Sequence, residues 1–266
     1  MSTLITIGCS FVQGVGMWYE DVEPITNENR ERHQKTYREE HLNVQLNNSI
    51  GAELQKELGY ETFINFGISG SSISNQLRAW FENPPKVNGD VLVLVFGTYP
   101  TRMGQYLSGT LGDVSLVDSF WSYPFKGEER ENRTIEEIDF DLHLDFIHNL
   151  RIFKDYCEIR NWKFEYCLMD DNYSDLYGAE IGDPFPNPFK EFQTELSDDE
   201  KCHLSPHPNN LGYKKIYNKF INWVRDNKKY WYVGERPVNK IIGWEITKFT
   251  IYGDAILRVI NKLPRF

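Results

Sequence analysis

The sequence predicts an α/β protein with a parallel sheet that helices cover on both faces. Short apolar runs alternate along the chain with longer segments in which apolar residues recur at helical spacing. This alternation is typical of βαβ units, whose strands are parallel and whose helices return over the sheet. The chain has 266 residues, of which 40% are hydrophobic. That length supports one large core, so we expect one domain with an appendage rather than two equal domains.

Four apolar runs are the predicted strands. The first runs from Leu4 to Ile7 and stops at Gly8, and the second covers residues 62–66. The third, residues 91–96, reads VLVLVF, a continuous apolar run of the kind that burial on both faces of a sheet requires. The fourth covers residues 163–169. Each run is short enough for a strand and is followed by a loop or a turn.

Helices are predicted after several of these strands. Ser49 is placed to cap a helix that Gly59 closes, and a long helix is expected over about residues 134–160. A third amphipathic helix follows a loop that reads HLSPHP, with its apolar residues on one side. The polar stretch over about residues 17–48 shows little periodicity, so we interpret it as a surface insertion.

The charge is unevenly distributed along the chain. The formal net charge is -10, but residues 227–266 alone carry +5 and the first 226 residues carry -15. We therefore predict one domain over residues 1–226 and a basic, aromatic C-terminal extension over 227–266. We expect this extension to serve docking or assembly, with a partner protein or with further copies of the chain. An acidic chain is not a general nucleic-acid binder.

The remaining bulk properties favour a cytoplasmic protein. No apolar stretch approaches the ~20 residues that a membrane-spanning helix needs, and the N-terminus lacks the pattern of a signal peptide. The four cysteines contain no C-x-x-C pair and are too few for a disulfide scaffold, which favours a reducing compartment. They are Cys9, Cys157, Cys167 and Cys202.

Three of the predicted strands end in loops that combine glycine with small or polar residues: GCSFVQG, GISGSS and GTYPTR. Parallel strands point the same way, so these loops converge on one edge of the sheet, where sites in open α/β sheets gather. We expect the HLSPHP loop to join them. Ser10 is then a candidate nucleophile and His207 its candidate base. The backbone N–H groups of Ser10 and Gly70 are candidate donors to an oxyanion.

These motifs resemble those of the SGNH hydrolases, the GDSL-like esterases and lipases. The resemblance implies a flavodoxin-like αβα sandwich, no metal or organic cofactor, Ser10 as nucleophile, His207 as general base, and the N–H groups of Ser10 and Gly70 in the oxyanion hole. The family blocks lie in the same order across residues 1–226. The block G-D-S-x-x-x-G matches Gly8, Cys9, Ser10 and Gly14; N-x-G-x-S-G matches Asn65, Gly67, Ser69 and Gly70; and D-x-x-H-P matches His207 and Pro208.

Two positions depart from the family pattern. The block G-x-N-D reads GTYPTR over residues 97–102, so its amide donor is missing. Tyr99 occupies that place, and Arg102 is our preferred replacement donor because its guanidinium is charged. Leu204 stands where the family has the Asp that orients the histidine. The candidates for that role are a backbone carbonyl, Asp198, Asp199 and His203.

Other interpretations stay open beside these. Cys9 is also a candidate nucleophile because a thiolate is intrinsically stronger, although it stands at the family's Asp position, where a small buried side chain is expected. Gly70 can be a simple turn glycine and Arg102 a surface arginine. Cys202, His203 and His207 resemble half a zinc site, but no second Cys or His pair stands at a suitable spacing, so no metal is predicted.

Two functions from different classes follow from the sequence. The first is a serine esterase that acts on a small ester, with O-acetyl groups on a carbohydrate as the substrate class implied by the resemblance. The second is a catalytically degenerate SGNH fold that serves as a binding or structural module, for example in a virus particle. The stretch GCSF in place of GDSL resembles a variant of bacteriophage-encoded members of the family. A virion-associated location is therefore expected beside the cytoplasmic one.

Overall fold

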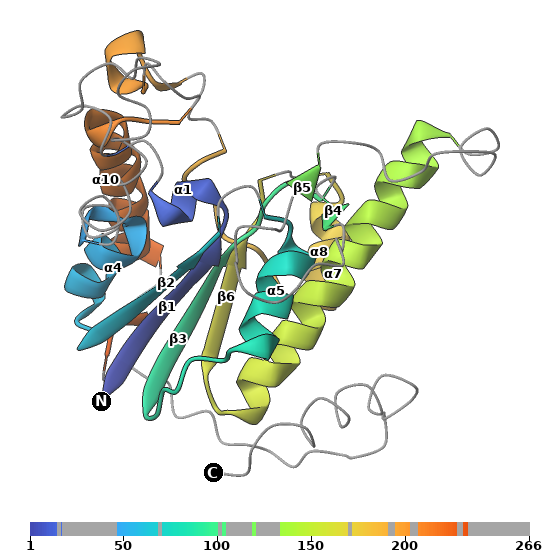
Figure 1. Ribbon diagram of the computed structural model, residues 1–266, viewed down its shortest axis with the longest axis horizontal. Helices are drawn as coiled ribbons and strands as arrows, with labels where there is room; N and C mark the ends of the chain where they lie inside the picture. Colours follow the sequence, from blue (N-terminus) through green and yellow to red (C-terminus); the bar gives the residue numbers. More distant parts are fainter. Residues whose placement is uncertain are drawn as a thin grey trace, which may run out of the picture. The chain divides into compact units, whose positions relative to one another are not determined.

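A four-stranded parallel sheet forms the centre of the fold (Figure 1). Its strands are β1 (Ser2–Gly8), β2 (Thr62–Gly67), β3 (Asp90–Phe96) and β6 (Lys163–Cys167), in the order β2-β1-β3-β6. A separate antiparallel pair joins β4 (Met103–Gly104) to β5 (Ser119–Phe120). The parallel sheet with flanking helices confirms the predicted α/β fold class. All four predicted strands are present.

The structure is a computed structural model, and the residues that it describes all belong to one unit, Met1–Glu235. They are residues 1–14, 17, 47–68, 71–100, 103–104, 119–120, 134–169, 172–190, 195–202, 207–227 and 231–233.

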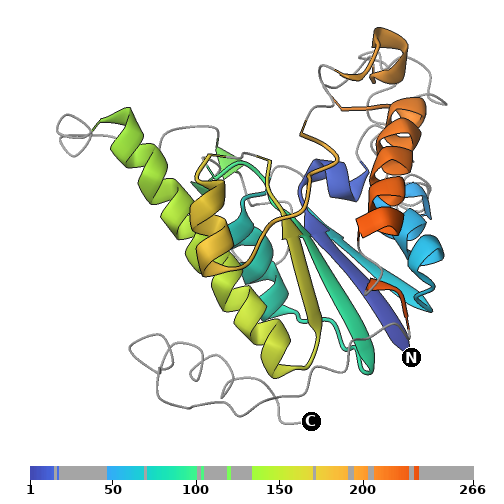
Figure 2. The same cartoon turned by 180° about the vertical axis from the view of Figure 1, so that it is seen from behind.

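Helices cover both faces of the sheet (Figures 1 and 2). On one face, α4 (Ile50–Leu58) packs on β1 and β2 and also contacts α10 (Asn210–Asn227). On the other face, α5 (Ile73–Glu82) packs on β1 and on α7 (Ile135–Ile159), which also contacts β6 and α8 (Ser174–Glu180). The described helices thus form the outer layers of a three-layer α/β/α arrangement.

The helix ends follow from local sequence. The Ser49 side chain accepts the N–H of Ala52 at the start of α4, and Gly59 ends that helix in the left-handed conformation, with φ 75°. At the start of α7, Thr134 and Glu137 form a reciprocal capping box. The capped starts of α4 and α7 agree with the positions that the sequence predicts.

Aromatic side chains fill both sides of the sheet. Trp80 on α5 is fully buried and meets Phe153 on α7 edge to face, with ring centroids 5.1 Å apart. On the α4 and α10 side, Phe96 at the end of β3 contacts Phe220 at 5.9 Å. Rings in such pairs add to the free energy of burying apolar area. The sheet is therefore held on both faces by large, interlocking side chains.

Trp231 carries the chain back into the core after α10. It is fully buried, its Nε1 donates to Glu165 Oε1 at 2.9 Å, and its carbonyl accepts the Tyr60 hydroxyl at 3.0 Å. The first residues of the predicted C-terminal extension are thus part of the described fold. Residues 234–266 and nearly all of the predicted insertion at 17–48 lie outside the described residues, so their roles stay predictions.

None of the helices in the described part of the chain combines the length and the apolar character that crossing a membrane would require.

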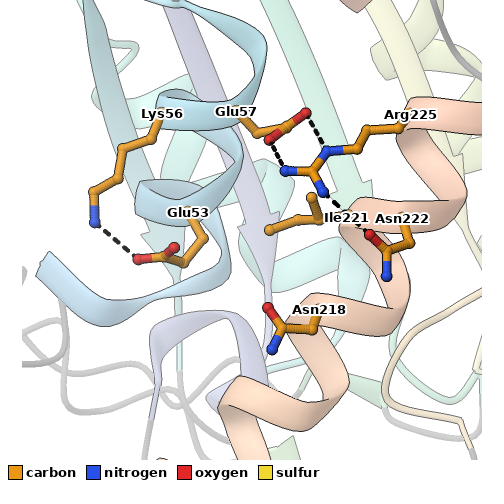
Figure 3. A pocket seen from close by; sticks show the side chains of 7 residues that line it. All are labelled: Glu53, Lys56, Glu57, Asn218, Ile221, Asn222 and Arg225. Carbon is orange, nitrogen blue, oxygen red and sulfur yellow. Dashed lines mark hydrogen bonds and ion pairs between the residues drawn. The ribbon is translucent and has the colours of Figure 1, made fainter.

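An ion pair joins the two helices on one face of the sheet. Glu57 on α4 accepts two hydrogen bonds from Arg225 on α10, at 2.7 and 2.5 Å, across a pocket of about 450 Å³ (Figure 3). Tyr232 donates to the same carboxylate at 3.0 Å. The hydrogen bond from Arg225 holds the pKa of the Glu57 carboxyl below its usual range.

We expect Glu57→Gln to lower the Tm by a few degrees at pH 7. A carboxyl whose pKa is depressed by folding contributes stability above its unfolded pKa, and this contribution disappears as the pH falls through the folded pKa. The difference in Tm between the variant and the wild type should therefore shrink below pH 4.5. Glu53→Gln is the matched control, because Glu53 lines the same pocket and pairs with exposed Lys56 on its own helix. A pH-independent difference would contradict the assignment.

We also expect truncation after Asn227 to destabilise the protein far more than truncation after Glu235. Loss of a buried Trp side chain costs about 3–5 kcal/mol, and each kcal/mol shifts the Tm of a domain of this size by about 2–4 °C. The shorter chain should melt about 10 °C below the longer one. Trp231→Ala in the full chain should reproduce most of that loss. Equal melting of the two truncated chains would refute the role given to Trp231.

Candidate active site

A tight strand-to-helix turn presents Ser10 at the carboxyl end of β1. A Cβ at Gly8 would collide with the Val12 side chain and lie 3.1 Å from the Phe96 carbonyl oxygen, so only glycine fits where the turn begins. Cys9 is extended, and its carbonyl accepts the N–H groups of Val12 and Gln13, each at 3.1 Å. The short helix α1 (Ser10–Gln13) therefore starts directly after the strand.

Ser10 and His207 lie in direct contact. The Oγ of Ser10 is 2.7 Å from Nε2 of His207, although the two residues are 197 positions apart in the chain. Ser10 is 5% exposed, and His207 is half-buried. This is the geometry in which an imidazole can remove a hydroxyl proton. The structure thus brings together the two residues that the sequence predicts as nucleophile and base.

Two phenylalanines support the imidazole. The ring of Phe11, which follows Ser10, lies 5.0 Å from the His207 ring and tilts by 50°. Phe11 in turn stacks on buried Phe189 at 5.3 Å. The sequence motifs do not indicate this pair; the one available signal is that Phe11 directly follows Ser10. Together the two rings fix one side of the imidazole.

Cys9 and Ser10 have different environments. Cys9 is 5% exposed and belongs to the buried hydrophobic cluster on the α4 and α10 side of the sheet. Close to it, burial raises the pKa of the Cys167 thiol and of the Tyr213 hydroxyl, so both groups stay neutral. Among the described residues, the side chains of this cluster near Cys9 are therefore neutral. Cys9 has the small buried side chain that the sequence analysis expected at this position.

The end of β2 is fastened to α1 by Asn65. Its Nδ2 donates to the Val12 carbonyl at 2.9 Å, and its Oδ1 accepts the Gly67 N–H at 2.9 Å. A Cβ on Gly67 would lie 2.5 Å from the Gln13 backbone nitrogen, so the two segments touch through glycine. The sequence indicated Asn65 only as part of a motif. In the structure its side chain joins the second loop to the first.

The predicted oxyanion donors are only partly described. The N–H of Ser10 is the first of its helix and has no acceptor within that helix, which leaves it able to donate to a ligand. Tyr99 is half-buried and packs against the hydrophobic cluster. Gly70 and Arg102 lie outside the described residues. Their proposed contributions stay predictions.

The candidates for orienting His207 differ in position. Asp198 is fully exposed and its carboxylate pairs with Lys201 at 3.6 Å. Asp199 is also exposed. Among the described residues, neither carboxylate hydrogen-bonds to the imidazole. His203 lies outside the described residues, so its role stays a prediction.

The alternative zinc site is also only partly described. Cys202 is a buried free thiol whose backbone N–H donates to the His207 carbonyl at 2.8 Å. His203, the third member of that set, lies outside the described residues. Within the described ranges no three His, Cys, Asp or Glu side chains gather in a way that could hold a metal ion.

The comparisons with known proteins give distant structural likenesses. No protein-family model matches the sequence, and no curated protein sequence matches it. A solved carbohydrate esterase is 16% identical with a TM-score of 0.49; the match covers 86% of this chain and 66% of the esterase. An alpha/beta hydrolase enzyme from the metagenome of Lake Arreo, Spain, is 14% identical with a TM-score of 0.41; the match covers 83% of this chain and 94% of that one.

We expect Asn65→Ala to loosen α1. The variant loses both hydrogen bonds and leaves the Val12 carbonyl without this partner, at a cost of about 1–3 kcal/mol. Hydrogen exchange at the Val12, Gln13 and Gly14 amides should accelerate more than exchange in the central strands. Asn65→Asp keeps an acceptor for Gly67 but lacks the donor for Val12, so it should accelerate the same amides. Unchanged exchange in both variants would refute this role.

Proposed function

We propose that this chain is a serine esterase of the SGNH type that hydrolyses a small ester. The hydrogen bond between Ser10 Oγ and His207 Nε2, at 2.7 Å, is the single observation that carries the proposal. A serine hydroxyl is a weak nucleophile unless a base takes its proton, and this base is within reach. The position of Ser10 at the carboxyl end of a central parallel strand, where sites of such sheets gather, adds to this support.

The proposed reaction has two steps. In the first, Ser10 Oγ attacks the acyl carbon while His207 Nε2 takes the hydroxyl proton, and the carbonyl oxygen becomes an oxyanion. Collapse of this intermediate breaks the ester bond, and the imidazolium returns the proton to the leaving alcohol. In the second step His207 deprotonates a water molecule, which attacks the acyl-Ser10 ester. The acid is then released and the Ser10 hydroxyl is restored.

The surroundings of Ser10 suit the oxyanion of this reaction. The buried hydrophobic cluster that includes Cys9 lowers the local dielectric beside Ser10, which strengthens each hydrogen bond to a developing charge. The Ser10 N–H is one donor to the oxyanion. We propose Gly70 N–H and the Arg102 guanidinium as further donors, with the Tyr99 hydroxyl as the alternative to Arg102. No chemical step in this scheme requires a metal ion or an organic cofactor.

The proposed substrate class is an O-acetyl ester on a carbohydrate. The support is the resemblance of three sequence blocks to the SGNH hydrolases, on which Ser10 and His207 both lie. The second candidate is a binding or structural module with the same fold. It is favoured by the residues at two family positions, Tyr99 in place of the amide donor and Leu204 in place of the orienting Asp.

We expect a fluorophosphonate probe to label Ser10 in the folded protein, and p-nitrophenyl acetate to be hydrolysed. Ser10→Ala should abolish labelling, and His207→Ala should slow both labelling and hydrolysis by about 100-fold or more because general base catalysis is lost. Cys9→Ala is the matched control one residue away and should keep its label. Mass spectrometry of the labelled peptide identifies the modified residue.

The outcomes separate the two candidate functions. A label on Cys9, or esterase activity that survives Ser10→Ala, would refute the assigned nucleophile. Folded wild-type protein without any label or hydrolysis would refute the esterase and favour the binding module. Acetylated and deacetylated glycans of the same backbone would then be compared as ligands of Ser10→Ala, which keeps the fold and lacks the nucleophile.

A further inference from the structure

We infer that Asn209 is a positioning residue for His207, an inference that rests on the proposed role of His207 as the base. Asn209 lies two positions after His207, directly before α10. It is 7% exposed, and both ends of its side-chain amide are hydrogen-bonded. The amide oxygen accepts hydrogen bonds from the start of α10, and the amide nitrogen donates to the segment that precedes His207. The side chain therefore couples the position of His207 to the rigid start of α10.

His207 stands at the end of a narrow two-stranded neck, formed by residues 201–202 and 207–208. Lys201 and Pro208 form an antiparallel bridge, and the Cys202 N–H donates to the His207 carbonyl at 2.8 Å. These contacts fix the backbone of His207 relative to residues 201–202. The orientation of the imidazole toward Ser10 therefore depends on where this neck lies.

One end of the Asn209 amide caps α10. Its Oδ1 accepts the N–H of Leu211 at 3.0 Å and the N–H of Gly212 at 3.1 Å. The backbone carbonyl of Asn209 also accepts the Tyr213 N–H at 2.9 Å. These are the bonds of an N-cap residue, and Asn is among the best residues for that position. Asn209 is thus held firmly by an 18-residue helix.

The other end of the amide holds the neck. Nδ2 donates to the Asp199 carbonyl at 2.6 Å, with a longer contact of 3.4 Å to the Lys201 carbonyl. The Asn209 backbone N–H donates to the Glu200 carbonyl at 3.0 Å. The residue that caps α10 therefore also hydrogen-bonds to the turn η3 (Asp198–Glu200) and to Lys201 in the neck. One side chain spans all three segments.

Further contacts press this turn against α10. A Cβ at Gly212 would collide with the Glu200 carbonyl oxygen, so the turn and the helix are in contact through a glycine. Lys215 donates to Glu200 Oε2 at 2.8 Å, and this hydrogen bond lowers the pKa of Glu200 to about 2. The pair therefore stays ionised at mildly acidic pH. The Lys215–Glu200 pair lies at the surface, whereas Asn209 joins the same turn to α10 from a buried position.

A positioning role matters here because proton transfer depends strongly on geometry. A displacement of about 1 Å can cost about 100-fold in rate. The imidazole moves with the backbone of His207, so the contacts that hold this backbone contribute to the alignment. Asn209 is a buried side chain that supports those contacts.

The test uses two substitutions that separate the N-cap of α10 from the hydrogen bonds that Nδ2 donates to the Asp199 and Lys201 carbonyls. Asn209→Asp keeps an oxygen for the Leu211 and Gly212 N–H groups, and a negative charge is favourable at a helix start. It has no donor for the Asp199 and Lys201 carbonyls. Asn209→Ala loses both functions. Thr134→Ala is the matched control, because it removes the N-cap of α7, far along the chain from the site.

We expect Asn209→Asp to keep the wild-type Tm within a few degrees and to lower kcat for p-nitrophenyl acetate by about 10- to 100-fold. KM should change less than about twofold, since the substrate contacts remain. Hydrogen exchange of the Cys202 amide should accelerate, while the amides of α10 stay protected. Asn209→Ala should lose both kcat and Tm. Thr134→Ala should lose Tm and keep kcat.

An unchanged kcat in Asn209→Asp would overturn the inference. So would a loss of kcat in Thr134→Ala as large as that in Asn209→Asp, because the effect would then be one of global stability. Wild-type protein that is neither labelled nor active would refute the proposed function instead. In that case faster Cys202 exchange in Asn209→Asp still supports the hold of Asn209 on the His207 segment, and unchanged exchange overturns it.

Discussion

The candidate site depends on the register of β1 between its two neighbours. Gly8 at the end of β1 pairs with Gly67 of β2, and Ile7 pairs with Val95 of β3, so all three strands end at nearly the same level. Parallel hydrogen bonding fixes this level, because a shift by one residue would exchange the two faces of the strand. The Ile68 N–H also donates to the Gly8 carbonyl at 2.9 Å. The backbone register alone therefore brings together Ser10, Asn65 and the start of the third loop.

Most of the fold could be predicted from the sequence because the strands are short, apolar and clearly bounded. The run of residues 91–96 is buried throughout, as its composition requires. The helices α4, α7 and α10 have caps or a clear apolar face. The helices α5 and α8 were not predicted. α5 does have a local start signal, because the Ser72 side chain accepts the Asn75 N–H, but this serine was interpreted as part of the preceding loop. The N-cap of α8 is Tyr173, with φ 60° and no side-chain cap, so the local signal for that helix is weak.

Only those site residues could be predicted from the sequence whose side chains are themselves reactive. Ser10 and His207 are reactive groups in recognisable motifs, and the structure places them in hydrogen-bonding distance. Asn65 and Asn209 act through carbonyl groups of other loops, and a sequence does not reveal which backbone oxygen a side-chain amide will meet. The stack of Phe11 on Phe189 joins positions that only the folded chain brings together. Sequence motifs thus identify reacting groups more readily than the residues that hold them.

The same reasoning explains why Ser10 rather than Cys9 faces His207. Cys9 is the last extended residue before α1, and its buried side chain belongs to the hydrophobic cluster. One residue later the chain is helical, and the side chain of Ser10 points to the imidazole instead. Gly8 sets where this change occurs, because no side chain fits between Val12 and the Phe96 carbonyl. The choice of nucleophile in the proposed esterase is therefore made by backbone packing at Gly8, and not by the intrinsic reactivity of the two neighbours.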